Sequence, residues 1–158
     1  MSVKPVPEGY HTITPYLSIK GAAAAIDYYK RAFSAVELFR LDAPNGQVGH
    51  AELKIGDSSI MLADECPEEA AFHNPQDLGG STIALHLYVA DADALFAQAV
   101  KAGGKVIKPV EDQFYGDRTG TLQDPYGHVW FIATHKEDLA PEEINRRAEE
   151  MFKKMGGA

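Results

Sequence analysis

The chain has 158 residues, of which 45% are hydrophobic and 24% charged, and its formal net charge is −8. That length suits one ordinary domain or two very small ones. The acidic balance and the lack of a basic stripe argue against a nucleic-acid partner and permit a cationic ligand. The single cysteine, Cys66, excludes an internal disulfide and favours a cytoplasmic location. We find no signal peptide and no apolar run near the roughly 18 residues of a membrane span.

The first half of the chain predicts a strand, a helix and three further strands. Apolar residues recur at helical spacing from Ala22 to Ala35, whereas the segments around them alternate as strands do. Asn45-Gly46 is a strong hairpin turn, and Gly56-Asp57 turns the chain again. The expected strands are Thr12–Ile19, Val36–Leu41, Val48–Ile55 and Ser58–Ala63.

The second half predicts the same order of elements. Asp91 suits the N-cap of a helix over Ala92–Ala102, and Gly103-Gly104 ends that helix. Asp124-Pro-Tyr-Gly127 places Pro and Gly where a type I turn needs them. The expected strands are Thr82–Val89, Lys105–Val110, Arg118–Gln123 and His128–Thr134.

Two segments lie outside this pattern. Residues 64–80 are rich in proline, glycine and acids, which predicts a loop without a regular element. Residues from about 140 to 155 predict a helix, because Pro141 suits its first position and four Glu–Arg or Glu–Lys pairs follow at i,i+4. An apolar stripe on this helix packs either on its own domain or against a second chain. The stripe comprises Ile144, Ala148, Met151 and Met155.

The two halves match at an offset of seventy residues without a gap. Thr14–Ile19 falls on Ala84–Val89, and Ser59–Leu62 falls on Val129–Ile132, so strands align with strands and helix with helix. We therefore expect residues 1–158 to form a single domain of two modules. Module 1 covers about 10–63, a linker 64–80, module 2 about 81–135, and a C-terminal helix about 140–155.

Alternation separates two faces of the expected sheet. One face is apolar and should lie under the two helices. The other mixes aromatic rings with a few polar groups, which is typical of the lining of a ligand cavity; a solvent-exposed sheet or a dimer surface is the alternative. This second face carries Thr14, Tyr16, Ser18, His50, Glu52, Met61, Ala84, His86, Tyr88, Phe131 and His135.

Paired modules of this length resemble the vicinal oxygen chelate superfamily, which includes glyoxalase I, extradiol dioxygenases and bleomycin-resistance proteins. Seven short motifs, in order over roughly residues 8 to 150, resemble its PhnB-like branch. The resemblance implies an α+β fold of two tandem βαβββ modules that form a cupped mixed sheet, plus a C-terminal helix. The motifs are Ile13-Thr-Pro-Tyr-Leu17, Ala25-Ile-Asp-Tyr-Tyr-Lys-Arg-Ala-Phe33, His50-Ala-Glu-Leu53, Ile60-Met-Leu-Ala-Asp64, Val110-Glu-Asp-Gln-Phe-Tyr-Gly-Asp-Arg118, Asp124-Pro-Tyr-Gly-His-Val-Trp130 and Thr134-His-Lys-Glu-Asp138.

Metal-using members of the superfamily take His, Glu or Gln ligands from the first and fourth strands of each module. The resemblance carries those positions to Thr14, Met61 (Leu62 if the register slips), Ala84 and Phe131. None of these side chains is a normal ligand for a divalent metal. We therefore expect no cofactor and no metal ligands, although a divalent metal held by other residues stays an alternative.

Candidate site residues lie mainly on the mixed face. His86 and Glu52 would act as acid and base or hold a displaced metal; alternatively, His86 only hydrogen-bonds a ligand or a neighbour. Arg118 either clamps a carboxylate or phosphate, or forms a salt bridge with Asp117 or Glu52. The full expected set is Glu52 and His86 as catalytic residues, and Thr14, Tyr16, His50, Glu52, Met61, His86, Tyr88, Phe114, Tyr115, Arg118 and Phe131 as ligand-binding residues.

Three functions follow from these residues and the resemblance. The first is a metal-free protein that binds a small organic molecule in an aromatic-lined cup, similar to the bleomycin-resistance members. The second is a metal-dependent lyase, isomerase or dioxygenase with displaced ligands. The third is a metal-free enzyme with Glu52 or His86 as general base. We expect a homodimer, because superfamily members often pair modules across a dimer, and no nucleic-acid or membrane partner.

Overall fold

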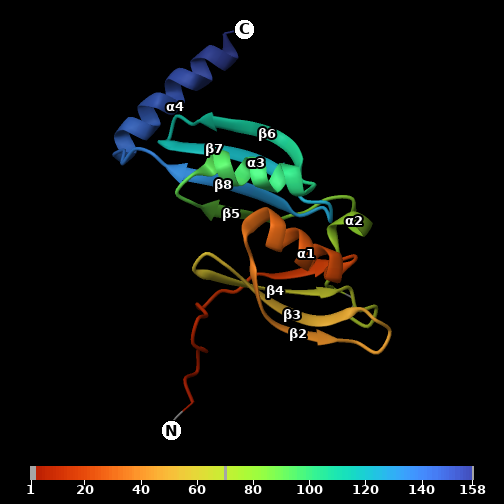
Figure 1. Ribbon diagram of the computed structural model, residues 1–158. Coiled ribbons are helices and arrows are strands. Elements are labelled where there is room, and N and C mark those ends of the chain that lie inside the picture. Colours follow the sequence, from red (N-terminus) through yellow and green to blue (C-terminus); the bar gives the residue numbers. More distant parts are fainter. Residues whose placement is uncertain (1–2, 70, 158) are drawn as a thin grey trace.

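The structure is a computed structural model that describes residues 3–69 and 71–157, so residue 70 of the expected linker lies outside the described residues. Two four-stranded mixed sheets, one from each module, lie side by side (Figure 1). Helices α1 and α3 pack against each other and each covers one face of its own sheet. The predicted α+β fold of two tandem modules is therefore confirmed. The strand orders are β1-β4-β3-β2 and β5-β8-β7-β6.

Module 1 has a parallel pair at one edge of its sheet and antiparallel pairs elsewhere. Strands β1 and β4 pair in parallel, with Tyr16 opposite Met61, and β4 then pairs antiparallel with β3. Gly46, at a φ of 81°, occupies the turn between β2 and β3, where a side chain would be strained. The elements are β1 (Tyr16–Ile19), α1 (Ala22–Phe33), β2 (Val36–Asp42), β3 (Val48–Ile55) and β4 (Ser58–Asp64).

Module 2 repeats this topology. Strands β5 and β8 pair in parallel, with His86 opposite Phe131, and β8 pairs antiparallel with β7. The predicted cap is present, because the Asp91 carboxylate accepts a hydrogen bond from the Ala94 amide at 3.0 Å. The elements are β5 (Ala84–Tyr88), α3 (Ala92–Ala102), β6 (Lys105–Asp112), β7 (Asp117–Gln123) and β8 (Val129–His135), followed by α4 (Pro141–Gly156).

Two local predictions need correction. The first strand begins at Tyr16 rather than Thr12, because Pro15 has no N–H and contributes only its carbonyl, which accepts from the Met61 amide. The linker was expected to hold no regular element, and this was wrong for α2 (Pro75–Leu78). Asn74 caps this short helix by accepting a hydrogen bond from the Asp77 amide.

One buried carboxylate ties the two modules together. Asp124, in the turn before β8, accepts hydrogen bonds from the Tyr29 hydroxyl of α1 at 2.6 Å and from the Trp130 indole of β8 at 2.9 Å. Trp130 and Tyr29 are fully buried, and their rings are in contact with that of Phe33. Side chains of both modules therefore share one core, which lies between the helices and the two sheets.

Candidate functional site

The face of each sheet turned away from α1 and α3, which we call the cup face, carries the polar and aromatic side chains. Along β3, Ala51, Leu53 and Ile55 are buried toward the helix, whereas His50 and Glu52 are half-buried on the cup face. Alternation along the strand thus separates core from site, as it does in any half-buried sheet.

Four side chains on the cup face of module 1 form a continuous row of hydrogen bonds, which we call the tyrosine–histidine row. The Tyr16 hydroxyl of β1 lies 2.7 Å from His50 Nδ1, and His50 Nε2 lies 3.2 Å from Glu52 Oε1. The Tyr10 hydroxyl, from the segment before β1, donates to the other oxygen of Glu52. The row therefore joins β1, β3 and the N-terminal segment.

The carboxylate sets the direction of these hydrogen bonds. Glu52 accepts only, so His50 Nε2 donates to it, and Nδ1 is left to accept the Tyr16 proton. Hydrogen bonds from Tyr10 and His50 hold the pKa of Glu52 below its usual value. Burial and the nearby carboxylates of Glu69 and Glu52 raise the pKa of Tyr16, and burial with the Glu52 hydrogen bond raises the pKa of Tyr10 to about 12. Both tyrosines are thus neutral proton donors near neutral pH.

Each end of the tyrosine–histidine row opens into a cavity of about 440 Å³. The linker cavity lies at the Tyr16 end, where the Phe72 ring stands edge-on to Tyr16 at 5.3 Å between centroids. The N-terminal cavity lies at the Glu52 end. The linker cavity is lined by Tyr16, Gly49, Ala63, Asp64, Cys66, Glu69 and Phe72. The N-terminal cavity is lined by Pro5, Val6, Pro7, Tyr10, His11, Thr12, Thr14, Glu52 and Met61.

The cup face of module 2 is built differently. The His86 ring stacks on Phe131 at 5.7 Å between centroids and contacts the Tyr88 ring at 4.7 Å. The Tyr88 hydroxyl donates to buried Asp117 at 2.8 Å. His135 bridges two carboxylates, because its Nδ1 lies 2.7 Å from Asp117 and its Nε2 2.8 Å from Asp138. We call Tyr88, Asp117, His135 and Asp138 the aspartate–histidine row.

The two carboxylates of the aspartate–histidine row favour the charged form of His135. A histidine that donates from both nitrogens is an imidazolium, and the two carboxylates raise the pKa of His135 accordingly, Asp138 more than Asp117. Burial alone would raise the pKa of Asp117, but hydrogen bonds from His135 and Tyr88 outweigh it, and this pKa is lowered. The aspartate–histidine row therefore becomes an ion-pair network when His135 is protonated.

The expected catalytic pair is not brought together as a pair. Glu52 is hydrogen-bonded to His50 and Tyr10 in module 1, whereas His86 stacks on aromatic rings in module 2. Phe114 and Tyr115 contact each other in the turn between β6 and β7, at the end of the sheet that holds the aspartate–histidine row. Thr14 and Met61 line the N-terminal cavity beside Glu52.

Arg118 is not held on the cup face. Its guanidinium forms ion pairs with Asp93 at 2.7 Å and Asp112 at 3.1 Å, and hence lies on the α3 side of β7. The salt-bridge alternative thus holds, but both expected partners, Asp117 and Glu52, were wrong. Alternation explains the error, since Arg118 and Asp117 are adjacent in β7 and point to opposite faces.

The four positions that the family resemblance gives as metal-ligand positions do not fit a metal here. Thr14, Met61, Ala84 and Phe131 offer at most one hydroxyl and one thioether, neither of which is a strong ligand for a divalent cation. Within residues 3–69 and 71–157, no three His, Cys, Asp or Glu side chains are grouped so that they could hold a metal ion. No chemical step is therefore assigned to a metal at these positions.

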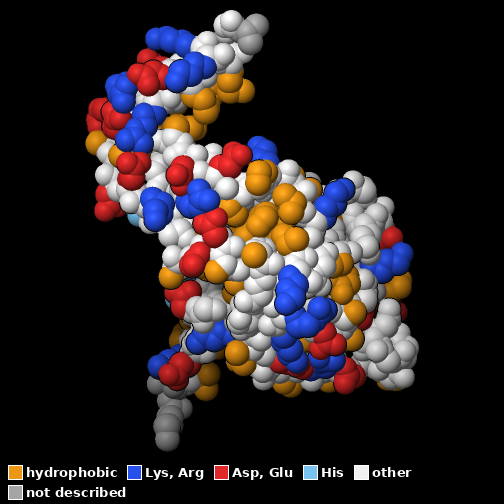
Figure 2. Space-filling view, turned by 45° about the horizontal axis from the view of Figure 1, so that its top comes forward, with side chains coloured by type: hydrophobic (Ala, Val, Ile, Leu, Met, Phe, Trp, Pro, Cys, Tyr) orange, Lys and Arg blue, Asp and Glu red, His pale blue; other side chains and the backbone are white. Residues whose placement is uncertain are grey.

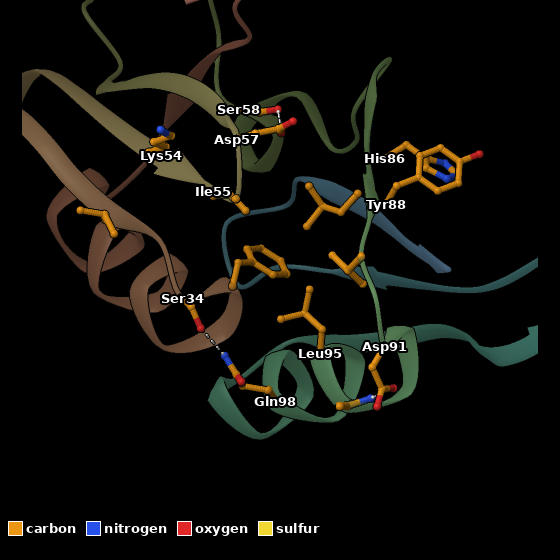
Figure 3. A pocket seen from close by; sticks show the side chains of 16 residues that line it. Ser34, Lys54, Ile55, Asp57, Ser58, His86, Tyr88, Asp91, Leu95 and Gln98 are labelled. Atoms are coloured by element: carbon orange, nitrogen blue, oxygen red, sulfur yellow. Dashed lines mark hydrogen bonds between the residues drawn. The ribbon is translucent and has the colours of Figure 1, made fainter. Parts of the chain in front are cut away.

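A larger groove of about 1030 Å³, which we call the intermodule groove, lies on the helix side of β5. Figure 3 shows Leu95 and Ile55 pointing into it, while His86 and Tyr88 line it from the outer side of β5. Its apolar floor belongs to both modules, and its rim carries Lys54, Asp57 and Asp91. The groove thus lies mainly on the helix side of the sheets and is bordered by His86 and Tyr88 of the cup face. Its floor comprises Phe33, Val36, Ile55, Leu87, Val89 and Leu95.

Several site residues were missed from the sequence. Tyr10 and Phe72 come from segments without regular structure, and their position depends on how those segments cross the sheet. Asp117 was considered only as a partner of Arg118. The sequence could have indicated its position, because Asp117 neighbours Arg118 in an alternating strand and therefore points to the opposite face.

Comparison with known proteins identifies the family of this chain. Residues 11–132 match the family model of the Glyoxalase/Bleomycin resistance protein/Dioxygenase superfamily. An uncharacterized protein of Mycobacterium bovis is 40% identical over 134 residues, which cover 84% of this chain and 88% of that protein. Within the described part of the chain, no helix has the length and apolar character needed to cross a membrane.

Solved structures show the same fold. A gene product of Arabidopsis thaliana superposes with a TM-score of 0.64 at 25% identity, over 80% of this chain and 99% of that one. A Bacillus cereus structure, described as a putative 3-demethylubiquinone-9 3-methyltransferase and PhnB protein, gives a TM-score of 0.62 at 18% identity. That match covers 78% of this chain and 99% of the other, and it shows the fold alone.

Proposed function

Because this chain belongs to the Glyoxalase/Bleomycin resistance protein/Dioxygenase superfamily, we propose that it is a metal-free protein that binds a small organic molecule on an aromatic-lined cup face. The observation that carries this proposal is the tyrosine–histidine row of module 1 between its two cavities. A cavity with aromatic walls and a few convergent polar groups is the usual form of a small-molecule site.

The linker cavity favours a cationic aromatic guest. Tyr16 and Phe72 form a T-shaped pair that lines the cavity, so a flat ligand there meets aromatic rings in two orientations. The Glu69 carboxylate lies close enough to raise the pKa of Tyr16, and it supplies negative charge at the cavity wall. The net charge of −8 attracts the same class of ligand from a distance.

Donor chemistry supports the metal-free part of the proposal, since the family positions carry Thr14, Met61, Ala84 and Phe131. Elemental analysis of protein purified without chelator tests it. We expect less than about 0.1 equivalent of nickel, zinc, manganese or iron. Stoichiometric metal that survives dialysis would overturn this part of the proposal.

A thermal-shift screen of cationic aromatics and of 2-oxo acids tests the ligand class. We expect stabilisation by the cationic aromatics, and we expect Glu69→Gln to weaken their binding roughly tenfold, because the variant removes a carboxylate from the cavity wall. Glu68→Gln is the matched control, since Glu68 is an exposed acid of the same linker that does not line the cavity. Stabilisation by 2-oxo acids alone, or equal effects of both variants, contradicts the assignment.

The tyrosine–histidine row also supports a second candidate function, a metal-free acid–base enzyme. We propose that a substrate C–H or O–H group gives its proton to the Tyr16 oxygen while the Tyr16 proton passes to His50 Nδ1. The electron pair stays on the substrate, and the imidazolium is stabilised by Glu52 at 3.2 Å. A hydroxyl, an imidazole and an orienting carboxylate in sequence form the general arrangement of an activated hydroxyl. Glu52 thus acts through His50, in place of the pairing with His86.

Hydrogen exchange distinguishes binding from catalysis. If the row moves protons, a carbonyl compound bound in the linker cavity will exchange its acidic C–H hydrogens for deuterium in D₂O, as followed by NMR. His50→Gln will slow this exchange by roughly 10²–10⁴-fold while ligand affinity changes little. Exchange at the uncatalysed rate in the wild-type protein would leave the binding function in place and reject the enzyme.

We further propose a cytoplasmic location, which the free, exposed Cys66 supports. An exposed thiol is most stable where the surroundings are reducing. Localisation of a fluorescent fusion expressed in cells tests this proposal directly. Export of the fusion would contradict it.

A further inference from the structure

A cavity of about 360 Å³ lies between the two modules, beside α2, and we call it the seam cavity. Module 1 contributes β1 to its wall, and module 2 contributes the segment before β5 and the turn between β7 and β8. The linker adds Phe72 and the helix α2. Only Tyr16 and Phe72 also line the linker cavity. The volume lies within the range of about 300–1,000 Å³ that is usual for small-molecule sites.

Helix α2 forms a fixed wall of the seam cavity. The Gln76 side-chain amide donates to the Pro125 carbonyl at 3.1 Å, which ties α2 to the turn before β8. In the same turn, a side chain at Gly127 would meet the Pro75 Cβ at 2.9 Å, so the turn packs directly against the helix. The cavity is therefore formed before any ligand arrives, and binding does not require a segment to become ordered.

The seam cavity has an uncharged lining. None of the described residues that line it is Asp, Glu, Lys or Arg, although these residues make up 24% of the chain. Figure 2 shows charged side chains spread over the visible face of the molecule and crowded on α4. The linker cavity, in contrast, is lined by Asp64 and Glu69 among others. A charged ligand in the seam cavity would lose hydration without gaining a counter-charge, so the cavity favours an uncharged molecule.

Two polar side chains, one from each module, meet at the seam cavity. Ser18 is 2% exposed, and its hydroxyl reaches the Phe72 carbonyl only at 3.5 Å, whereas an ordinary O–H···O hydrogen bond measures about 2.7–2.8 Å. His128 Nε2 lies 3.0 Å from the Ser18 carbonyl. A carbonyl only accepts, so Nε2 carries the hydrogen of the neutral imidazole and Nδ1 is left as an acceptor. The cavity wall thus holds a weakly engaged donor and an acceptor on two residues that are directly linked through the Ser18 carbonyl.

We propose that the seam cavity binds an uncharged alcohol or phenol, whose hydroxyl group accepts from Ser18 Oγ and donates to His128 Nδ1. A hydroxyl is a small uncharged group that does both, whereas an ether or a ketone only accepts. The apolar body of the ligand packs against Phe72, Leu85 and Val129. This ligand class differs from the cations proposed for the linker cavity, so the inference does not depend on the proposed function.

The test is an NMR titration of the full chain, with isotope-labelled histidine rings and para-cresol as the ligand. We expect the His128 Nδ1 signal to shift and saturate, because this nitrogen accepts a hydrogen bond from the phenol. The methyl ether of para-cresol lacks the donor and should bind roughly tenfold more weakly. The charged analogues para-hydroxybenzoate and tyramine should leave the His128 signal in place, because the cavity offers them no counter-charge.

A matched pair of buried serines in the sheet of module 1 tests the donor. Ser18→Ala should weaken para-cresol binding roughly tenfold, whereas Ser59→Ala should not, since Ser59 does not line the seam cavity. Circular dichroism confirms that both variants fold, and the wild-type His128 signal decides if Ser18→Ala does not. Glu69→Gln should leave para-cresol binding unchanged, which separates this inference from the proposed function.

Three results would overturn the proposal. The first is a His128 signal that stays in place while His50 shifts or while nothing shifts. The second is equal affinity for para-cresol, its methyl ether and its charged analogues at His128. The third is unchanged affinity in a folded Ser18→Ala variant.

Discussion

The two cup faces come from one repeated architecture and carry different chemistry. In module 1, a neutral tyrosine, a histidine and a single carboxylate follow one another, with Tyr10 at the far end. In module 2, the histidine lies between two carboxylates, and Asp117 is also bonded by Tyr88. In the first row the hydrogen bonds run from Tyr16 through His50 to Glu52, whereas in the second two carboxylates flank His135 and favour its charged form.

The two rows also differ in the segments and cavities that surround them. Segments without regular structure cross the cup face of module 1 and leave a cavity at each end of its row. The row of module 2 lies instead where the chain leaves β8 toward α4, and His135 and Asp138 fix that exit. The two modules thus share one fold and one core, while the cup face of module 1 borders two cavities and that of module 2 borders the segment that leads to α4.

The largest expected effect concerns Asp124, the buried carboxylate that links the two modules. Asp124→Ala leaves the buried Tyr29 hydroxyl and the Trp130 indole without their acceptor, so we expect a loss of about 3–5 kcal/mol in the free energy of unfolding. Urea denaturation measures it. The equivalent β3–β4 turn of module 1 gives the control, because Asp57 is exposed and Asp57→Ala should change stability by less than about 0.5 kcal/mol. Equal losses of stability in the two variants would contradict the role of Asp124 as the link between the modules.

The aspartate–histidine row predicts a pH dependence of defined sign. The pKa of His135 is raised in the folded state, so its stabilising contribution is fully present below the unfolded pKa of about 6.5. That contribution is lost as the pH rises through the folded pKa. His135→Gln should therefore destabilise the protein more at pH 6 than at pH 9, as measured by urea unfolding at both values.

Asp138→Asn sharpens this test, because it removes the larger of the two causes of the shift and should reduce the pH dependence of the wild type. The lowered pKa of Asp117 acts in the opposite direction and only under acid conditions, so it does not affect this window. A loss that is the same at pH 6 and pH 9 would show that His135 carries no extra charge in the folded state.

Much of the fold follows from periodicity, since turn signals bound the elements. Val48–Ile55 lies between a hairpin Gly and a second turn, and Ala92–Ala102 lies between a cap and a glycine pair; both have the predicted ends. The repeat supplies the rest, because each module predicts the other. The short helix α2 was not predicted, since its four residues are too few to show a helical period.

The candidate site was less predictable. Alternation put Tyr16, His50 and Glu52 on one face, and the structure brings them into one hydrogen-bonded row. Nothing in the local sequence indicates that Tyr10 reaches Glu52 or that Phe72 reaches Tyr16, because those contacts span more than forty residues. Arg118 shows the opposite error. The sequence suggested that it lies at the cup, but its guanidinium forms ion pairs with Asp93 and Asp112 on the other face of the sheet.

The smallest expected effect lies at the far end of the tyrosine–histidine row. Tyr10→Phe removes one hydrogen bond to Glu52 and should cost about 1 kcal/mol in stability. The same change should bring the pKa of Glu52 back toward its usual value, because the Tyr10 hydrogen bond is the main cause of its lowering. NMR titration of the Glu52 carboxyl carbon measures this shift. An unchanged titration would remove Tyr10 from the row.

The central claim is that ligand binds at the row of module 1 and not at the row of module 2. NMR of labelled histidine and tyrosine rings, during titration with a cationic aromatic found in the screen, tests this claim directly. We predict that the His50 and Tyr16 signals shift and saturate together while those of His135 and Tyr88 stay in place. Shifts confined to His135 and Tyr88, or saturable binding that leaves His50 and Tyr16 unmoved, would contradict it.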